Sequence, residues 1–230
     1  MTNMILALIG LLSFGSSDST SPSVHGQSQR WEFNNLAGWT DASQNMNGTI
    51  NYVIQNDTLR MYTRRGTWDR PKVKTVDSNY TSGTYTWRVY VPEMGKGDRS
   101  SIGAFLYQDD THELDFETGY GTKKIREELG AVKDDIVVYM TSQAYPFQSI
   151  PQKIKREQWH TFSIRLEDNQ GKYLASWYID GRPAVQLPLG FGPETHFAIF
   201  CSVENLKFIG DHIAKQDNYA LFDYVEYKND

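Results

Sequence analysis

The chain has 230 residues, of which 39% are hydrophobic and 22% charged, and its formal net charge is −5 at pH 7. This length suits one large domain with a sizeable core, and this composition excludes extensive disorder. The sequence holds no basic tract, so it does not indicate nucleic-acid binding. Its one cysteine, Cys201, excludes a disulfide within the chain and a metal site built from cysteines.

The N-terminal residues predict an exported protein. An apolar run from Met4 to Phe14 precedes small and polar residues, as in a secretory signal, and it is too short to span a membrane. The following stretch, "SSDSTSPSVHGQSQ", is typical of a polar linker. We therefore predict a signal-like segment and linker over residues 1–29, a single domain over residues 30–230, and a secreted, extracellular or periplasmic location.

Short strands separated by turns are predicted over the rest of the chain. In "GTYTWRVYVP" apolar and polar side chains alternate, which places Tyr85 and Trp87 on one face of a strand. Asp180 and Gly181 supply the positive φ angles of a tight hairpin turn. Many short strands with such turns predict an all-β sandwich or barrel. The predicted strands lie within 49–65, 83–92, 101–108, 112–117, 134–143, 158–167, 173–187, 196–203 and 219–228, with one short helix at 123–129.

Three carboxylates alternate along the predicted strand "HELDFE". Glu113, Asp115 and Glu117 share one face of it, while a leucine and a phenylalanine share the other. One interpretation is a solvated outer face over a buried apolar pair. However, no Lys or Arg is interleaved to relieve the repulsion, and the preceding strand is too apolar for a sheet edge. Three uncompensated acids in that place favour a catalytic site.

The chemistry of such a cluster fits glycoside hydrolysis. That reaction needs one protonated carboxyl group to assist departure of the leaving sugar and one ionised group to attack or to activate water. The Cα atoms of Glu113 and Glu117 are ~13 Å apart on an extended strand, a gap that two glutamate side chains can largely close. Asp115, between them, would raise the pKa of the acid by its proximity. The spacing leaves a retaining and an inverting mechanism both open.

The segment "ELDFE" matches the Glu-x-Asp-x-Glu signature of glycoside hydrolase family 16, which comprises laminarinase- and lichenase-type β-glycanases. The segments "YTSGTYTWRVYVP", "SSIGAFLYQDDTHELDFETGYG", "QWHTFSIRLEDNQGKYLASWYIDGRPA" and "LFDYVEYK" also resemble that family and follow its order. The resemblance therefore covers nearly all of residues 30–230. It implies a concanavalin-like jelly-roll sandwich of two antiparallel sheets with a concave carbohydrate-binding cleft.

The same resemblance implies roles for the three acids. Glu113 would be the nucleophile, Glu117 the general acid/base and Asp115 an assisting group, in an endo-acting, retaining hydrolase of β-linked polysaccharide. The sequence departs from the family pattern in the strand "GAFLYQ", where only Tyr107 keeps a position for stacking on a sugar. The substrate, β-glucan or β-galactan, therefore stays open.

Four further residues are candidates for substrate binding beside Tyr107. Trp68 and Arg65 lie in the polar loop "TRRGTWDRPK", which suits stacking on a sugar and binding of a sulfate or uronate group. The alternative is a tryptophan folded under its own loop. Tyr145, which would form a pair with Phe147 in "AYPFQS", is either a stacking residue or a loop anchor. Trp177 lies on a strand and either belongs to the core or reaches the cleft.

The predicted reaction requires no cofactor, and no His and carboxylate spacing indicates zinc. The family resemblance is compatible with a structural Ca²⁺ ion that uses Asp223. The expected partner is a polysaccharide, and we expect a monomer. Two rival functions remain: a sandwich domain that binds carbohydrate without cleaving it, and a transglycosylase in which a sugar intercepts the same intermediate. Asn47, Asn56 and Asn79 are acceptors for N-glycosylation in a host that glycosylates secreted proteins.

Overall fold

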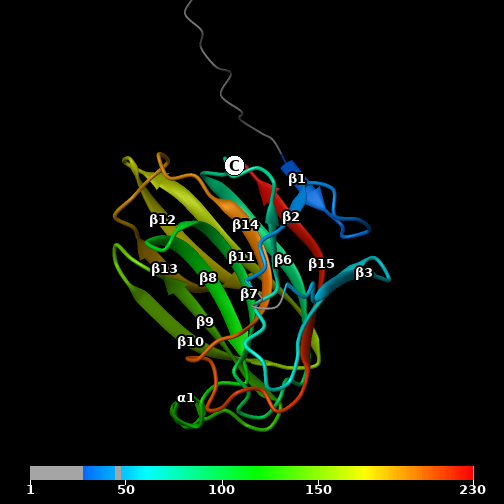
Figure 1. Cartoon of the computed structure of the whole chain (residues 1–230). Helices are drawn as coiled ribbons and strands as arrows, with labels where there is room; N and C mark the ends of the chain where they lie inside the picture. Colours follow the sequence, from blue (N-terminus) through cyan, green and yellow to red (C-terminus); the bar gives the residue numbers. More distant parts are fainter. Residues whose placement is uncertain (1–27, 45–47, 230) are drawn as a thin grey trace, which may run out of the picture.

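The computed structural model describes residues 28–44 and 48–229. The predicted signal-like segment and almost all of the linker lie outside the described residues, as does Asn47. Two antiparallel sheets are packed face to face, with one short helix, α1 (Lys123–Glu128), at the lower end (Figure 1). The predicted all-β sandwich of two antiparallel sheets is confirmed. No helix among the described residues is long and apolar enough to cross a membrane.

The described residues form one sheet of eight strands and one of seven. The eight-stranded sheet has the order β13 (Arg182–Pro188), β12 (Lys172–Ile179), β11 (Gln158–Asn169), β6 (Gly83–Val91), β15 (Asn218–Lys228), β4 (Thr58–Thr63) and β3 (Tyr52–Gln55), with β1 (Ser28–Trp31) paired to β15. The seven-stranded sheet has the order β10 (Gln148–Lys155), β9 (Asp135–Ser142), β8 (His112–Gly119), β7 (Ser100–Asp109), β14 (Ala198–Asn205), β5 (Lys72–Thr75) and β2 (Trp39–Asp41).

Each predicted strand segment overlaps at least one observed strand, and the predicted helix corresponds to α1. Four strands were not predicted: β1, β2, β5 and β10. β10 carries Pro151, which cannot donate to a ladder, and this strand is accordingly the edge of its sheet. β5 is only four residues long and reads "KVKT", too short to show an alternating pattern. β5 matters for function because it borders the site described below.

The core lies between the two sheets. In β6 the residues Tyr85, Trp87, Val89 and Val91 are all fully buried, as the alternation predicted. Phe116 of β8 stacks on a phenylalanine of β11, with ring centroids 4.8 Å apart, and so joins the two layers. Burial of these large side chains removes much apolar surface from water and fixes the position of β8.

Candidate active site

The strand β8 lies in the middle of the seven-stranded sheet, between β7 and β9. Leu114 and Phe116 on one face are fully buried in the core. Glu113, Asp115 and Glu117 on the other face line a cleft of about 660 Å³. Asp115 is only 1% exposed and Glu117 only 8% exposed, so the interpretation of a solvated outer face is wrong.

Glu117 lies over a glycine of the neighbouring strand. Its register partner in β7 is Gly103, and a Cβ atom there would be 2.4 Å from the Ser202 hydroxyl and 3.3 Å from Glu117 Oε1. The glycine therefore leaves room for this carboxyl group on the floor of the cleft. The hydroxyl of Ser101, also on β7, donates a hydrogen bond to Glu117. These contacts fix the orientation of the Glu117 carboxyl group.

Asp115 is held from the cleft side and from the core side. Gln143, which follows β9, donates a hydrogen bond from Nε2 to Asp115 Oδ2 at 3.2 Å. From the opposite sheet, Trp177 Nε1 donates to the main-chain carbonyl of Asp115, also at 3.2 Å. A tryptophan packed behind the strand thus supports the residue whose side chain faces the cleft.

Burial and mutual repulsion raise the pKa values of all three acids. Burial, together with the charge of Glu204, raises the pKa of Glu113 to about 7. Burial and the charge of Glu113 raise the pKa of Asp115 well above its usual value. Burial, Asp115 and Glu204 do the same for Glu117. The surroundings therefore favour the protonated form of each of the three acids.

Glu204 is a fourth carboxylate at this cleft, and it was not predicted from the sequence. It lies on β14, is 3% exposed and lines the cleft. Arg70 Nε and Lys72 Nζ contact Glu204 Oε2 at 2.5 and 2.8 Å. Two cations that share one buried carboxylate compensate its charge, which a buried ion requires.

Of the five residues predicted to bind substrate, Tyr107 lines the cleft, opposite Glu113 in the register of β7 and β8. The prediction for Trp177 is wrong, because this residue is 1% exposed and its ring lies between the sheets. β12 belongs to the eight-stranded sheet, whose inner face packs against the back of β8. Trp177 therefore reaches the strand that carries the carboxylates, but from the core side.

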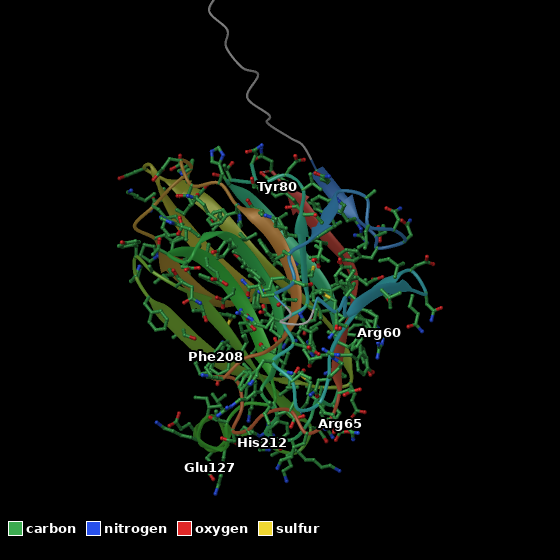
Figure 2. All side chains as sticks on the ribbon, viewed as in Figure 1. Arg60, Arg65, Tyr80, Glu127, Phe208 and His212 are labelled. Carbon is green, nitrogen blue, oxygen red and sulfur yellow. The ribbon has the colours of Figure 1, made fainter. Side chains whose placement is uncertain are left out.

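Trp68, Arg65 and Tyr145 do not line the cleft that holds the carboxylates. Trp68 is 41% exposed, and the amino group of Lys207 lies over its ring, 5.9 Å from the centroid. The main-chain N–H of Arg65 donates to Asp217 at 2.8 Å, and the residue lies toward the lower end of the molecule (Figure 2). Tyr145 is 61% exposed. Contact of these three with a substrate stays a prediction.

Further aromatic residues line the cleft, and of these Phe147 was considered as a stacking partner of Tyr145, whereas Phe105, Phe200 and Phe208 were not predicted. Phe105 and Phe200 are stacked, with ring centroids 4.7 Å apart and an interplanar angle of 15°. Phe147 and Phe208 are large exposed apolar residues of the lining, 69% and 53% exposed. Phe208, labelled in Figure 2, contacts Tyr139 of β9 edge-on. Exposed aromatic faces at a cleft suit stacking on sugar rings.

The described residues contain no group of three or more His, Cys, Asp or Glu side chains that could hold a metal ion. Asp223, the residue considered for Ca²⁺, lies at a bulge in β15 between Phe222 and Tyr224. Binding of Ca²⁺ at Asp223 stays a prediction. His160 is 4% exposed and bonded to Asp180 and to a main-chain carbonyl, as expected of a structural histidine.

Comparison with solved structures identifies the fold. A Bacillus licheniformis β-glucanase matches with a TM-score of 0.60 at 17% identity, over 88% of this chain and 98% of its own. An endo-1,3-β-glucanase catalytic domain from Thermotoga petrophila matches with a TM-score of 0.64 at 16% identity, over 89% and 98%. An endo-β-galactosidase from Clostridium perfringens that releases GlcNAcα1-4Gal has a TM-score of 0.62 at 13% identity, over 90% and 64%.

This chain has the jelly-roll fold of these β-glycanases. No protein-family model matches the sequence, and no curated protein matches it either. Within the jelly-roll fold, the three carboxylates lie on a central strand and face a cleft that crosses the seven-stranded sheet.

Proposed function

We propose that this protein is a secreted glycoside hydrolase of family 16 that cleaves β-linked polysaccharide in an endo fashion with retention of configuration. The observation that carries the proposal is the trio of Glu113, Asp115 and Glu117 at the floor of the cleft, of which Asp115 and Glu117 are buried and Glu113 is partly buried. The fold shared with β-glucanases and an endo-β-galactosidase supports it, as do the Glu-x-Asp-x-Glu motif and its sequence context.

The surroundings of the acids support distinct roles for them. With a pKa of about 7, Glu113 is ionised in part at neutral pH and can act as the nucleophile. Burial and the neighbouring Asp115 raise the pKa of Glu117 well above its usual value, which favours the protonated form that a general acid needs. The pKa of Asp115 is raised as well, and its protonated form can donate a hydrogen bond to an ionised neighbour. This division matches the roles that the motif implies.

The decisive experiment is release of reducing ends from a panel of neutral and anionic β-glucans and β-galactans. The Glu113→Gln and Glu117→Gln variants serve as blanks, because each removes one carboxyl group while nearly preserving its shape. We expect each variant to lose at least about 10³-fold in kcat, the scale for removal of a member of a catalytic set. The anomeric configuration of the first product, followed by NMR, tests retention.

Full turnover in either variant would refute the role of that glutamate. Binding of a polymer without any release of reducing ends would instead support a carbohydrate-binding domain with no catalytic activity. New glycosidic linkages formed in the presence of excess oligosaccharide would support the transglycosylase, since acceptor choice depends on how well the cleft excludes water.

A further inference from the structure

The side chains that line the cleft differ in charge between the two sides of β8. The strand order β10-β9-β8-β7-β14-β5 places β9 and β10 on one side of the carboxylates and β14 and β5 on the other. We call these sides the neutral arm and the cationic arm. Their lining residues are Thr141, Gln143 and Ser149 in the neutral arm, and Arg70, Lys72 and Lys74 in the cationic arm. The neutral arm has no charged side chain among its described lining residues.

The three cations of the cationic arm differ in whether they contact a carboxylate. Arg70 and Lys72 both contact the buried carboxylate of Glu204. No hydrogen bond or ion pair of the Lys74 amino group occurs within the described part of the chain, although the main chain of Lys74 belongs to the ladders of β5 with β14 and β2. Three cations against one carboxylate leave this arm with an excess of positive charge, and Lys74, which is only partly exposed, carries an uncompensated part of it. Withdrawing an unpaired ammonium group from water costs free energy, which an anionic ligand would offset.

Lys74 is too far from the three acids to be their ion-pair partner. Across the sheet, Asp115 is paired with Phe105, Phe105 with Phe200, and Phe200 with Lys74. Three strand spacings separate the Cα atoms of Asp115 and Lys74 by ~14 Å. The stacked rings of the two phenylalanines lie between them. The amino group of Lys74 is therefore available at the far side of an aromatic floor.

Lys74 also stands where the cleft continues into a second cavity. This cavity has a volume of about 490 Å³ and shares Lys74, Tyr107 and Phe200 with the cleft. Its other lining residues include Gln108 and His196, which offer further polar contacts, and Glu194, whose carboxylate lies 3.8 Å from the Lys172 amino group. A polymer that runs along the cationic arm would pass over the aromatic residues and bring a substituent of its sugar to the Lys74 amino group.

We propose that the cationic arm is a subsite for an anionic sugar, bearing a sulfate ester or a carboxylate, with Lys74 as the residue that recognises the anionic group. This inference rests on the proposed function in one respect, that the ligand is a β-linked polysaccharide. The neutral arm on the other side of the carboxylates would hold an uncharged sugar. The polymer chain would then bind in one orientation across the cleft. In that orientation the sugar over the cationic arm carries the anionic group, and the sugar over the neutral arm carries none.

Binding to an inactive variant tests this proposal separately from catalysis. In the Glu113→Gln background, calorimetry would compare a soluble β-glucan and a soluble β-galactan, each as the neutral polymer, its sulfate ester and its C6-carboxylate. The protein would come from a host without N-glycosylation, because Asn79 lines the second cavity. The matched control for Lys74→Gln is Lys124→Gln, which removes a positive charge from an 86% exposed side chain on α1. Lys74→Arg tests whether charge alone is needed.

We expect one charged form to bind about tenfold more tightly than its neutral parent at low salt, and this preference to shrink at high salt. Lys74→Gln should remove most of the preference, Lys74→Arg should keep part of it, and Lys124→Gln should leave it intact. The form that gains affinity, sulfate or carboxylate, identifies the anionic group. Equal binding of charged and neutral forms, or a preference that survives Lys74→Gln, would overturn the proposal, whether or not the wild-type protein cleaves any polymer.

Discussion

Replacing Glu113 with glutamine should stabilise the fold at alkaline pH while removing activity. The pKa of Glu113 rises from 4.5 to about 7 on folding, because the side chain is buried and lies near the charge of Glu204. A carboxyl group with a raised pKa binds its proton more tightly in the folded state than in the unfolded state. Its contribution to stability is therefore complete below about pH 4.5 and is lost as the pH rises through about 7.

The size of the effect follows from the two pKa values. Each pKa unit corresponds to about 1.4 kcal/mol, so a pKa difference of about 2.5 corresponds to about 3 kcal/mol. Glutamine has nearly the same shape but does not ionise. The Glu113→Gln variant should thus have nearly the wild-type free energy of unfolding at about pH 4 and exceed it by about 3 kcal/mol at about pH 8.5. The charge of Glu113 also raises the pKa values of Asp115 and Glu117. Removing this charge lowers both pKa values, which further stabilises the variant relative to the wild type at alkaline pH.

Urea denaturation of both proteins at the two pH values measures the difference directly. Each pair of curves needs the same m value, so that the shift in midpoint reports stability alone. Glu127→Gln is the matched control, since it removes a carboxylate from a side chain 68% exposed on α1. A stability difference between variant and wild type that is the same at both pH values would refute the reasoning, because it would show that ionisation of Glu113 is not its cause.

The remaining predictions concern the contacts around the trio. Activity measured as kcat/KM should rise with pH through about 7 as Glu113 ionises, and fall when Glu117 loses its proton. Ser101→Ala removes a hydrogen bond that lowers the pKa of Glu117, so it should move the alkaline limb upward by about 1–2 pH units, from about 1.5–3 kcal/mol per charged hydrogen bond. Trp177→Phe should lower the free energy of unfolding by about 1–3 kcal/mol through the lost bond to Asp115 and lost volume.

Two observations would contradict these predictions. The hydroxyl of Ser100, next in the same strand, lies 3.2 Å from that of Thr63 and is buried away from the cleft. Ser100→Ala is therefore the control for Ser101→Ala, and an equal displacement of the pH limb in both variants would exclude a direct effect on Glu117. For Trp177→Phe, an unchanged urea midpoint would show that the contact behind β8 does not stabilise the fold.

The carboxylate face of β8 could be predicted because its signal is local. Side chains alternate along a strand, so the period of two alone places Glu113, Asp115 and Glu117 together whatever the rest of the fold is. The same reasoning correctly predicted the buried face of β6. Turn residues such as Asp180 and Gly181, both with positive φ, could be predicted for the same reason, since the turn depends on neighbouring residues only.

The rest of the cleft could not be predicted, because its residues meet only through register between distant strands. Lys72 and Glu204 are 132 positions apart in the chain, and β5, with four residues, has no recognisable pattern of its own. The prediction for Trp177 was wrong for a related reason. The alternation of side chains along β12 was visible in the sequence. Which face of this strand packs in the core, however, depends on the sheet to which the strand belongs.

The energetics of the trio argue for catalysis rather than for binding alone. Ionisation of Glu113 costs about 3 kcal/mol of stability above about pH 7, and a single substitution to glutamine would remove that cost while keeping the side chain's shape and hydrogen-bonding capacity. A protein that only binds sugar could use the amide equally well, since neutral donors and acceptors suffice for hydroxyl groups. A nucleophile, by contrast, has to be charged when it attacks. The stability cost therefore arises in the same ionisation step that the proposed reaction needs, and destabilised groups of this kind concentrate at functional sites.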